Sequence, residues 1–142
     1  MQPGICKPKR ETDPNPCWAV GTKGTILVVD DERPIVRLCK AMIANLGYSV
    51  KTAASGTEAL AVVAGSTVPI RLALLDMNLP DMTLAEIVLG IRRIDGRIPI
   101  IVQSGALMRR DDFTAEGLDI CDCLHKPYSM RELSEKLGQA LA

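Results

Sequence analysis

Five side chains of the kinds that bind metal ions and phosphoryl groups stand where apolar stretches of this sequence end. Asp30 and Asp31 close the first stretch, Asp76 closes a later one, and Ser104 and Lys126 close two more. If these stretches are parallel strands of one sheet, their carboxyl ends meet at a single edge. Two unit charges ~4 Å apart repel by about 4 kcal/mol at an effective dielectric of about 20, so three carboxylates there need compensation. Lys126 supplies one positive charge, and a hard divalent cation that prefers oxygen ligands, such as Mg²⁺, would supply two.

An aspartate held beside Mg²⁺ can act as a nucleophile toward phosphorus and form an aspartyl-phosphate. That transfer depends on positioning and on neutralising the charge of the phosphoryl oxygens. Mg²⁺, Lys126 and the hydroxyl of Ser104 would each contact one of those oxygens. Asp76 is the best candidate nucleophile because it stands alone at a central strand, whereas the adjacent Asp30 and Asp31 are better placed to hold the metal.

The elements that would position these residues follow from the pattern of apolar positions after residue 24. Short apolar stretches predict strands at residues 26–29, 48–53, 70–75, 98–102 and 120–124. Between them, apolar residues recur at helical spacing, most weakly over residues 109–116. Strands that alternate with helices imply parallel pairing, right-handed crossovers and helices on both faces of the sheet. We therefore predict an α/β fold, a doubly wound five-stranded parallel sheet with five helices, in the flavodoxin-like order 2-1-3-4-5 that is common in this class.

Local signals indicate where several helices begin or end, and which side of the first one is buried. The first helix is expected to end near Gly47 and to bury a stripe of four apolar residues: Ile35, Leu38, Met42 and Leu46. Cys39 lies near this stripe and is also expected in the core. Two later helices begin with a serine followed three positions on by a glutamate, which is typical of a capping box: Ser55 with Glu58, and Ser129 with Glu132.

Composition narrows the class of function. The chain of 142 residues carries 17 basic and 17 acidic side chains, and aromatic residues make up 3% of it. Without net positive charge or aromatic stacking platforms, we expect no direct binding of nucleic acid. No apolar stretch approaches the ~20 residues that cross a bilayer, so we expect no membrane insertion.

The cysteines indicate the cellular compartment, and the N-terminal stretch indicates where the folded domain begins. Five cysteines, an odd count, and a single histidine argue against a zinc site. Cys121 and Cys123 are interpreted as small buried side chains. Free thiols and no visible export signal favour a reducing, cytoplasmic setting. Residues 1–24 hold four of the nine prolines and are interpreted as a flexible tail or linker.

Four sequence motifs occur together, each at the end of an expected strand. They are residues 26–32 (ILVVDDE), residues 74–82 (LLDMNLPDM), Ser104-Gly105 and Lys126-Pro127-Tyr128. Together they resemble the receiver domain of two-component response regulators, over about residues 25–141. The resemblance implies a receiver domain at residues 25–142 that acts as a phosphorylation-dependent signalling switch in a phosphorelay.

The resemblance also implies roles for the acidic residues. Asp76 would be the phosphoacceptor and would take its phosphoryl group from a phosphohistidine on a histidine kinase or a histidine phosphotransfer protein. Asp31 and Asp76 would bind Mg²⁺ through their side chains, with the backbone carbonyl of Asn78 as a third ligand and Asp30 acting through water.

Further implications concern the switch itself. Ser104 would turn toward the phosphoryl group, Lys126 would pair with it, and the Lys126–Pro127 peptide bond would be cis. Such a domain assists its own phosphorylation and dephosphorylation rather than acting as an enzyme, and it signals to a partner through its fourth helix, fifth strand and fifth helix. The motifs around Ser104 and Lys126 are also similar to those of receivers fused to hybrid sensor kinases, so the chain could belong to a larger histidine kinase.

Two positions depart from the family pattern. Receivers usually have glycine eight residues after the phosphoacceptor, where this chain has Leu84, so the loop is expected to differ in shape. Many receivers carry Tyr or Phe three residues before the lysine, where this chain has Cys123. A small thiol cannot move between buried and exposed positions as an aromatic ring does, so this departure concerns the output movement and leaves the phosphorylation chemistry intact.

Two other functions fit parts of the sequence. A receiver-like adaptor that keeps the fold without being phosphorylated would be consistent with Leu84 and Cys123, although retention of all the site residues argues against it. A Mg²⁺-dependent phosphatase of the haloacid dehalogenase type also forms an aspartyl-phosphate. That class has Asp-x-Asp after its first strand and a substrate cap domain, whereas this chain has Asp-Asp-Glu at residues 30–32.

Overall fold

Strands and helices alternate along residues 23–141, the part of the chain that the computed structural model describes. The strands are β1 (Thr25–Val29), β2 (Ser49–Ala53), β3 (Ile70–Asp76), β4 (Ile100–Ser104) and β5 (Asp122–His125). The helices are α1 (Arg33–Asn45), α2 (Gly56–Gly65), α3 (Leu84–Ile94), α4 (Arg110–Thr114) and α5 (Met130–Leu141). All neighbouring strands pair in parallel, in the order β2-β1-β3-β4-β5. The predicted doubly wound, flavodoxin-like sheet with five helices is therefore confirmed.

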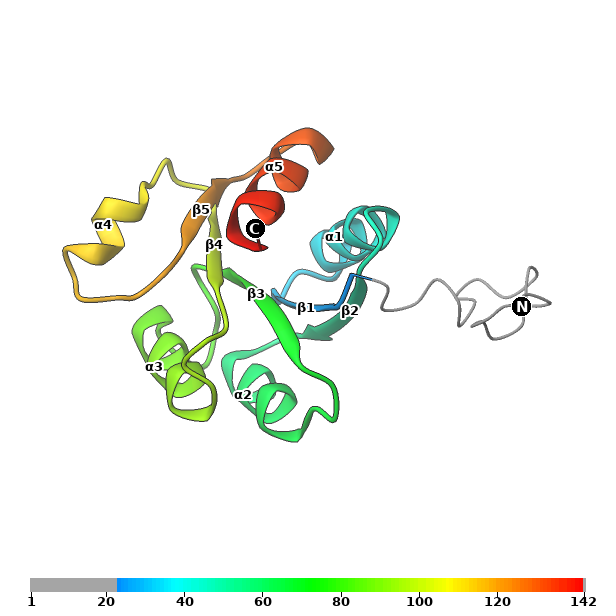
Figure 1. The fold of residues 1–142 in the computed structure, drawn as a ribbon. Coiled ribbons are helices and arrows are strands. Elements are labelled where there is room, and N and C mark those ends of the chain that lie inside the picture. Colours follow the sequence, from blue (N-terminus) through cyan, green and yellow to red (C-terminus); the bar gives the residue numbers. More distant parts are fainter. Residues whose placement is uncertain (1–22, 142) are drawn as a thin grey trace.

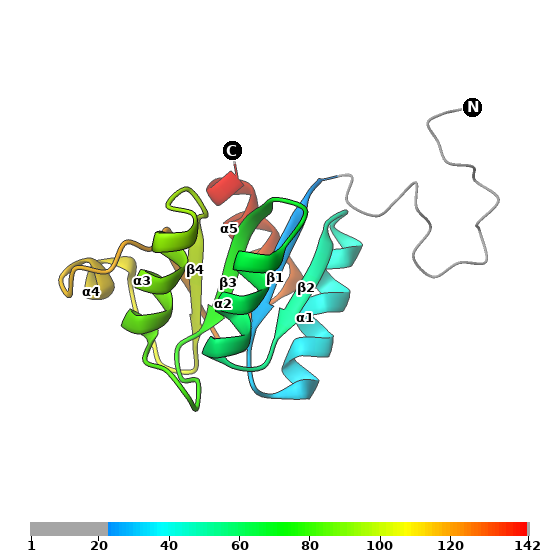
Figure 2. The ribbon, with the colours of Figure 1, turned by 90° about the horizontal axis from the view of Figure 1, so that it is seen from below.

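The sheet buries an apolar layer on each of its faces, because successive residues of a strand point to opposite sides. Leu75 and Val102 belong to the layer packed by α2 and α3, whereas Leu74 and Ile101 belong to the layer packed by α1 and α5 (Figure 1). Figure 2 shows α2 and α3 in front of the sheet, with α5 behind it. All four side chains are fully shielded from solvent, and burying one such side chain stabilises a fold by roughly 1.5–3 kcal/mol.

The first helix packs most of its predicted stripe against the core, but not Leu38. Three stripe residues are half-buried against the core: Ile35, Met42 and Leu46. Leu38 is 57% exposed, and the buried residues of α1 are Cys39 and Ile43. Cys39 follows Leu38 by one position, which rotates the side chain by about 100° around a helix of 3.6 residues per turn. The face that meets the sheet therefore centres on Cys39 and Ile43, and Leu38 points away from it.

β4 starts two residues later than predicted. Pro99 has no amide hydrogen and cannot donate to the neighbouring strand, so the ladder with β3 begins at Ile100. Only the carbonyl of Pro99 takes part, accepting a hydrogen bond of 3.0 Å from the amide of Ala73.

The fourth helix is shorter than the predicted stretch of residues 109–116. It spans five residues and gives way to a turn at Gly117, whose φ of +80° favours glycine. The amides of Gly117 and Leu118 bond back to the carbonyls of Thr114 and Phe113, at 2.9 and 3.0 Å. These hydrogen bonds form a turn that ends the helix before residue 116.

The thiols near β5 are half-buried rather than buried, contrary to the interpretation of the sequence. Cys121 and Cys123 both have intermediate exposure. β5 is an edge strand of the sheet and pairs with β4 alone, so its other edge has no neighbouring strand. The Cys123 thiol donates to the carbonyl of Met108 at 3.2 Å, and burial raises the pKa of this thiol above its usual value.

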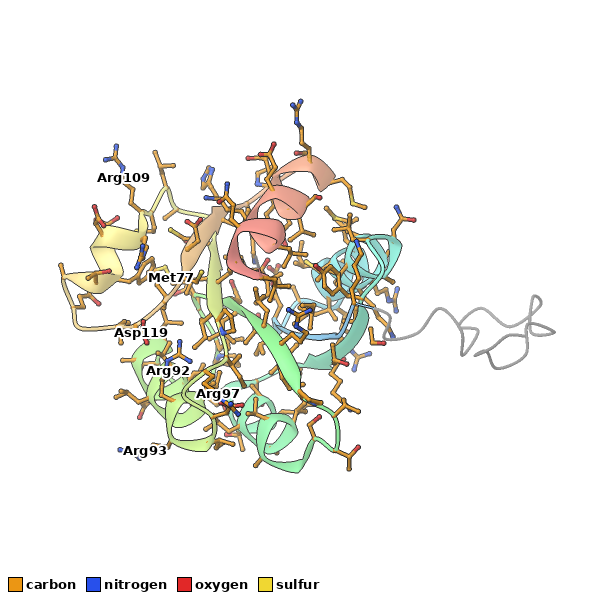
Figure 3. The ribbon with its side chains drawn as sticks, viewed as in Figure 1. Met77, Arg92, Arg93, Arg97, Arg109 and Asp119 are labelled. Atoms are coloured by element: carbon orange, nitrogen blue, oxygen red, sulfur yellow. The ribbon has the colours of Figure 1, made fainter. Side chains whose placement is uncertain are left out.

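Arg92 of α3 contacts the two segments that lead into β4 and β5. Its guanidinium donates to the carbonyls of Ile98 and Asp119 and pairs with the Asp119 carboxylate at 3.2 Å. Figure 3 shows Arg92 and Asp119 facing one another beside α3. α3 thereby connects the segments that lead into β4, which ends at Ser104, and into β5, which Lys126 follows.

The predicted helix caps form in full at one helix and in part at another. Ser129 accepts from the amide of Glu132 at 3.1 Å, and the Glu132 carboxylate accepts from the amide of Ser129 at 2.9 Å. Ser55 accepts from the amide of Glu58 in the same way, but the Glu58 carboxylate bonds to the amide one residue before the serine. Both arrangements satisfy amides that the first turn of a helix leaves without partners.

The described range excludes most of the predicted N-terminal tail. Of residues 1–24, only Lys23 and Gly24 are described, so the flexible linker stays a prediction. Among the helices of residues 23–141, none combines the length and the apolar character that crossing a bilayer would require.

Candidate functional site

The carboxyl ends of four strands bring the predicted site residues to one edge of the sheet. Asp30 follows β1, Asp76 ends β3, Ser104 ends β4 and Lys126 follows β5. Asp30, Asp31 and Asp76 each offer a carboxylate oxygen, and these oxygens lie within 4.8 Å of one another. The structure therefore assembles the acidic cluster that the pattern of strand ends predicted.

Lys126 bridges two of the three carboxylates. Its Nζ donates to Asp30 Oδ2 at 3.0 Å and to Asp76 Oδ1 at 3.1 Å. The side chains of Asp30 and Asp76 are 0% and 10% exposed, so the ammonium compensates negative charge that water hardly reaches. Burial lowers the pKa of Lys126, but its bonds to the two carboxylates outweigh burial and raise it overall, which keeps the amine charged.

The Asp76 carboxylate carries its negative charge at an energetic cost. Burial raises its pKa above the ordinary value of 3.8, the hydrogen bond from Lys126 acts in the opposite direction, and the charge of Asp30 raises it further. The net shift is upward, so one lysine does not fully compensate this cluster. Additional positive charge at this point would stabilise the ionised site.

The two remaining predicted ligands, Asp31 and Asn78, are both exposed to solvent. A cavity of about 250 Å³ opens beside Asp30 and Asp31. Asn78 lies two residues beyond Asp76, in the connection from β3 to α3. The three clustered carboxylates make an oxygen donor set of the kind that hard divalent cations prefer.

Ser104 is in place, but its hydroxyl is engaged within its own loop. The residue is 2% exposed, and its Oγ accepts a hydrogen bond of 3.0 Å from the amide of Ala106. Its backbone carbonyl accepts from the amide of Lys126 at 2.7 Å. The ends of β4 and β5 are thus tied together through their backbones, while the serine hydroxyl faces the connection to α4.

Asp81 holds the connection between β3 and α3 against the start of α2. Its carboxylate accepts from the amides of Gly56 and Thr57 at 2.8 and 2.9 Å and from the Thr57 hydroxyl at 2.6 Å. The Thr57 hydroxyl, followed by these amides, lowers the pKa of Asp81 to about 2. The connection next to Asp76 is therefore anchored to a second helix.

The two departures from the family pattern have distinct structural contexts. Leu84 is the first residue of α3, within the capping box that Thr83 forms with Glu86, and it packs against the core. Helix geometry suits leucine there. Cys123 contacts the carbonyl of Met108 in the connection between β4 and α4. The Lys126–Pro127 peptide bond is cis, as the resemblance implied.

Sequence reasoning missed a group of polar side chains behind the acidic cluster. Gln103 is fully buried, its Nε2 donates to Asp30 Oδ2 at 3.3 Å, and its Oε1 accepts from the Tyr128 hydroxyl at 2.6 Å. The Cys39 thiol lies 2.9 Å from that hydroxyl. The available signal was a glutamine at a position of β4 that points into an otherwise apolar layer.

Comparison with known proteins agrees with this geometry. A sequence model of the response regulator receiver domain matches residues 26–138. Among curated proteins, response regulator SaeR of Staphylococcus aureus (strain USA300) is 32% identical over 116 residues, which make up 82% of this chain and 50% of SaeR. The chain thus spans about half the length of the curated relatives that it matches.

Solved structures share the fold. A CheY-like response regulator receiver domain protein from Methanospirillum hungatei JF-1 has a TM-score of 0.73 and 28% identity, covering 82% of this chain and 92% of that one. Response regulator protein TrrA from Thermotoga maritima, solved in complex with Mg(2+)-BeF, has a TM-score of 0.69 and 31% identity, covering 82% and 98%. By sequence match, by topology and by the residues gathered at its strand ends, this chain belongs to the receiver domain family of two-component response regulators.

Proposed function

We propose that this receiver domain is a phosphorylation-dependent switch in which Asp76 accepts a phosphoryl group from a phosphohistidine. The observation that carries the proposal is the position of Asp76, which ends the central strand β3 inside a carboxylate cluster, with Lys126 Nζ 3.1 Å from its Oδ1. The phosphodonor would be a histidine kinase or a histidine phosphotransfer protein.

The transfer itself requires only displacement at phosphorus. A carboxylate oxygen of Asp76 attacks, an O–P bond forms, and the N–P bond of the phosphohistidine breaks, leaving its electron pair on the imidazole nitrogen. The Lys126 ammonium, already bonded to Asp76, would shift to a phosphoryl oxygen and neutralise part of its charge. Ser104 would exchange the amide of Ala106 for another phosphoryl oxygen. The domain thereby assists its own phosphorylation and dephosphorylation.

We infer that the carboxylate cluster binds Mg²⁺. Asp31 and Asp76 would hold the ion through their side chains, the backbone carbonyl of Asn78 would be a third ligand, and Asp30 would act through a water molecule. The oxygen donor set and the cavity beside Asp30 and Asp31 support this assignment. Bound Mg²⁺ supplies positive charge that offsets carboxylate repulsion and stabilises the charge of the transferring phosphoryl group.

We propose that the output surface is formed by α4, β5 and α5. Ser104 leads into the connection to α4, and Lys126 follows β5, so displacement of either side chain acts directly on this surface. That connection carries Leu107, which is 81% exposed, and Met108, whose carbonyl accepts from the Cys123 thiol. The thiol would transmit movement through this contact, where many receivers use an aromatic ring.

The proposal extends to the domain boundaries, the larger protein and the cellular compartment. Residues 1–24 would be a linker and residues 25–142 the receiver domain, which could belong to a hybrid histidine kinase or act with a separate target protein. A reducing cytoplasm is consistent with the thiols of Cys39, Cys121 and Cys123, which form no disulfide within residues 23–141.

A small phosphodonor tests the proposed chemistry without a partner protein. After incubation with acetyl phosphate and Mg²⁺, intact-mass spectrometry should detect one phosphoryl group per chain, and chelation of the metal should prevent its incorporation. If no phosphoryl group is found under conditions that label a known receiver domain, the chain is an adaptor that keeps the fold alone.

A further inference from the structure

We propose that Gln103, supported by Tyr128, is a positioning residue that holds the Asp30 carboxylate in the orientation that the metal site requires. The inference rests on the proposed Mg²⁺ site and adds two side chains that lie outside the proposed ligand set. It is carried by a continuous line of hydrogen bonds that ends on Asp30, half-buried at Tyr128 and buried between Gln103 and Asp30.

The amide of Gln103 can have only one orientation in this environment. A carboxylate accepts hydrogen bonds and donates none, so the Gln103 nitrogen must face Asp30 Oδ2, which it does at 3.3 Å. The amide oxygen then faces Tyr128, whose hydroxyl donates to it at 2.6 Å. Gln103 is fully buried, and an amide without partners there would be strongly unfavourable. Asp30 therefore selects the orientation of the amide, and the Tyr128 hydroxyl stabilises that orientation by donating to the amide oxygen.

Cys39 extends this line into helix α1. Its Sγ lies 2.9 Å from the Tyr128 hydroxyl and 3.9 Å from Gln103 Oε1. Since the Tyr128 hydroxyl donates to Gln103, the thiol is the donor to the Tyr128 oxygen. Burial raises the pKa of both Tyr128 and Cys39, so each keeps its proton at neutral pH. Donors then point in one direction, from Cys39 through Tyr128 and Gln103 to Asp30.

Gln103 differs from Lys126, the other side-chain donor to Asp30, because it would stay in place when the domain is phosphorylated. Asp30 Oδ1 accepts from the amide of Glu32 at 2.9 Å, and Oδ2 accepts from both Lys126 and Gln103. Lys126 is shared with Asp76 and is the group that would turn to a phosphoryl oxygen. Gln103 sits inside β4 and cannot follow it. When the lysine turns away, Gln103 remains as the donor that keeps Oδ2 in place.

A purely structural role makes a different prediction. If Gln103 only filled space in the layer beneath α1 and α5, methionine would replace it with little consequence, since the two side chains have similar length and volume. A positioning role predicts a selective loss of metal affinity. Partners that orient metal-binding carboxylates typically affect affinity by about 10–100-fold when removed.

Isothermal titration calorimetry with Mg²⁺ distinguishes the two roles. Gln103→Met should weaken Mg²⁺ binding about tenfold, as expected for a lost orienting partner. Tyr128→Phe, which removes a single hydroxyl, should weaken it less, and should have no further effect once Gln103→Met is present, because the hydroxyl acts through Gln103. Ile101→Val is the matched control: it alters the same face of the same strand without a polar contact to Asp30, and should leave the Kd unchanged.

The possible outcomes separate this inference from the proposed function. Equal Mg²⁺ affinity of the wild-type protein and Gln103→Met, or additive losses in the double variant, would overturn the positioning role and leave the metal site intact. Absence of Mg²⁺ binding by the wild-type protein would overturn the metal site and the positioning role together. If Gln103→Met does not fold, Tyr128→Phe decides alone, because unchanged affinity in that variant contradicts the relay.

Discussion

The Lys126 ammonium lies 3.1 Å from the Asp76 carboxylate, although the two residues are 50 positions apart in the sequence. Parallel strands make this contact possible because they end at the same edge of the sheet. The same ammonium also bonds to Asp30, so one positive charge serves two carboxylates that are largely shielded from water. The site is therefore short of positive charge.

Removing the lysine charge should destabilise the metal-free protein strongly. Lys126→Met keeps much of the aliphatic stem but leaves Asp30 and Asp76 without a cation, and breaking a buried ion pair costs about 3 kcal/mol. We expect this loss in the free energy of unfolding, measured with urea at neutral pH, and partial recovery with Mg²⁺.

Lys136→Met is the matched control for that measurement. Its partner Asp122 lies 2.8 Å away, but both side chains reach solvent, and such pairs contribute at most about 1 kcal/mol. Equal losses in the two lysine variants would show that Lys126 has no special role in compensating the cluster.

Mg²⁺ should raise the melting temperature of the wild-type protein at millimolar concentrations, because a ligand that binds only the folded state stabilises it. Asp31→Ala should abolish this rise, whereas Glu32→Ala, an exposed carboxylate outside the cluster, should preserve it. Without metal, Asp31→Asn should stabilise the fold slightly by removing one repelling charge. A metal response that survives Asp31→Ala, or a clear loss of stability in metal-free Asp31→Asn, would count against the site as described.

The raised pKa of Asp76 predicts how stability depends on pH in the absence of metal. Because this pKa is higher in the folded state than the ordinary 3.8, the folded protein holds the proton more tightly. The resulting stabilisation is complete below pH 3.8 and is lost as the pH rises through the raised pKa. Asp76→Asn cannot titrate at this position and should gain stability relative to the wild type over that range. Parallel pH profiles of the two proteins would contradict the assignment.

Asp81 should show the opposite dependence. Its pKa is lowered to about 2 by the Thr57 hydroxyl and the amides at the start of α2, so its stabilising effect is present above pH 3.8 and is lost as the pH falls through about 2. The wild type should be more stable than Asp81→Asn at neutral pH, and the difference should shrink on acidification. A carboxyl titration of Asp81 near 3.8, followed by NMR, would show that these hydrogen bonds do not hold the loop.

The location of the site could be predicted because its residues end apolar stretches, and apolar stretches that alternate with helices indicate parallel strands. The pattern of strand ends alone was enough to predict that three charged side chains meet: Asp30, Asp76 and Lys126. The direction of the Ser104 hydroxyl could not be predicted in this way. The hydroxyl accepts a hydrogen bond from the amide of Ala106, whose position depends on the path of the following loop.

Other features depend on packing that spacing does not determine. Both Leu38 and Cys39 are expected from the sequence to be buried in α1, and only the angle at which α1 meets the sheet leaves Leu38 exposed. Gln103 at a strand end is equally compatible with a turn residue. Its buried role depends on Tyr128, 25 positions away, whose hydroxyl reaches its amide oxygen.

Identification of the phosphorylated residue tests the central claim most directly. Wild-type protein, Asp76→Asn and the matched variant Asp81→Asn would be incubated with acetyl phosphate and Mg²⁺, and each intact mass measured before and after acid treatment. We expect one acid-labile phosphoryl group on the wild type and on Asp81→Asn, and none on Asp76→Asn. A phosphoryl group that persists on Asp76→Asn would contradict the assignment of Asp76 as the phosphoacceptor.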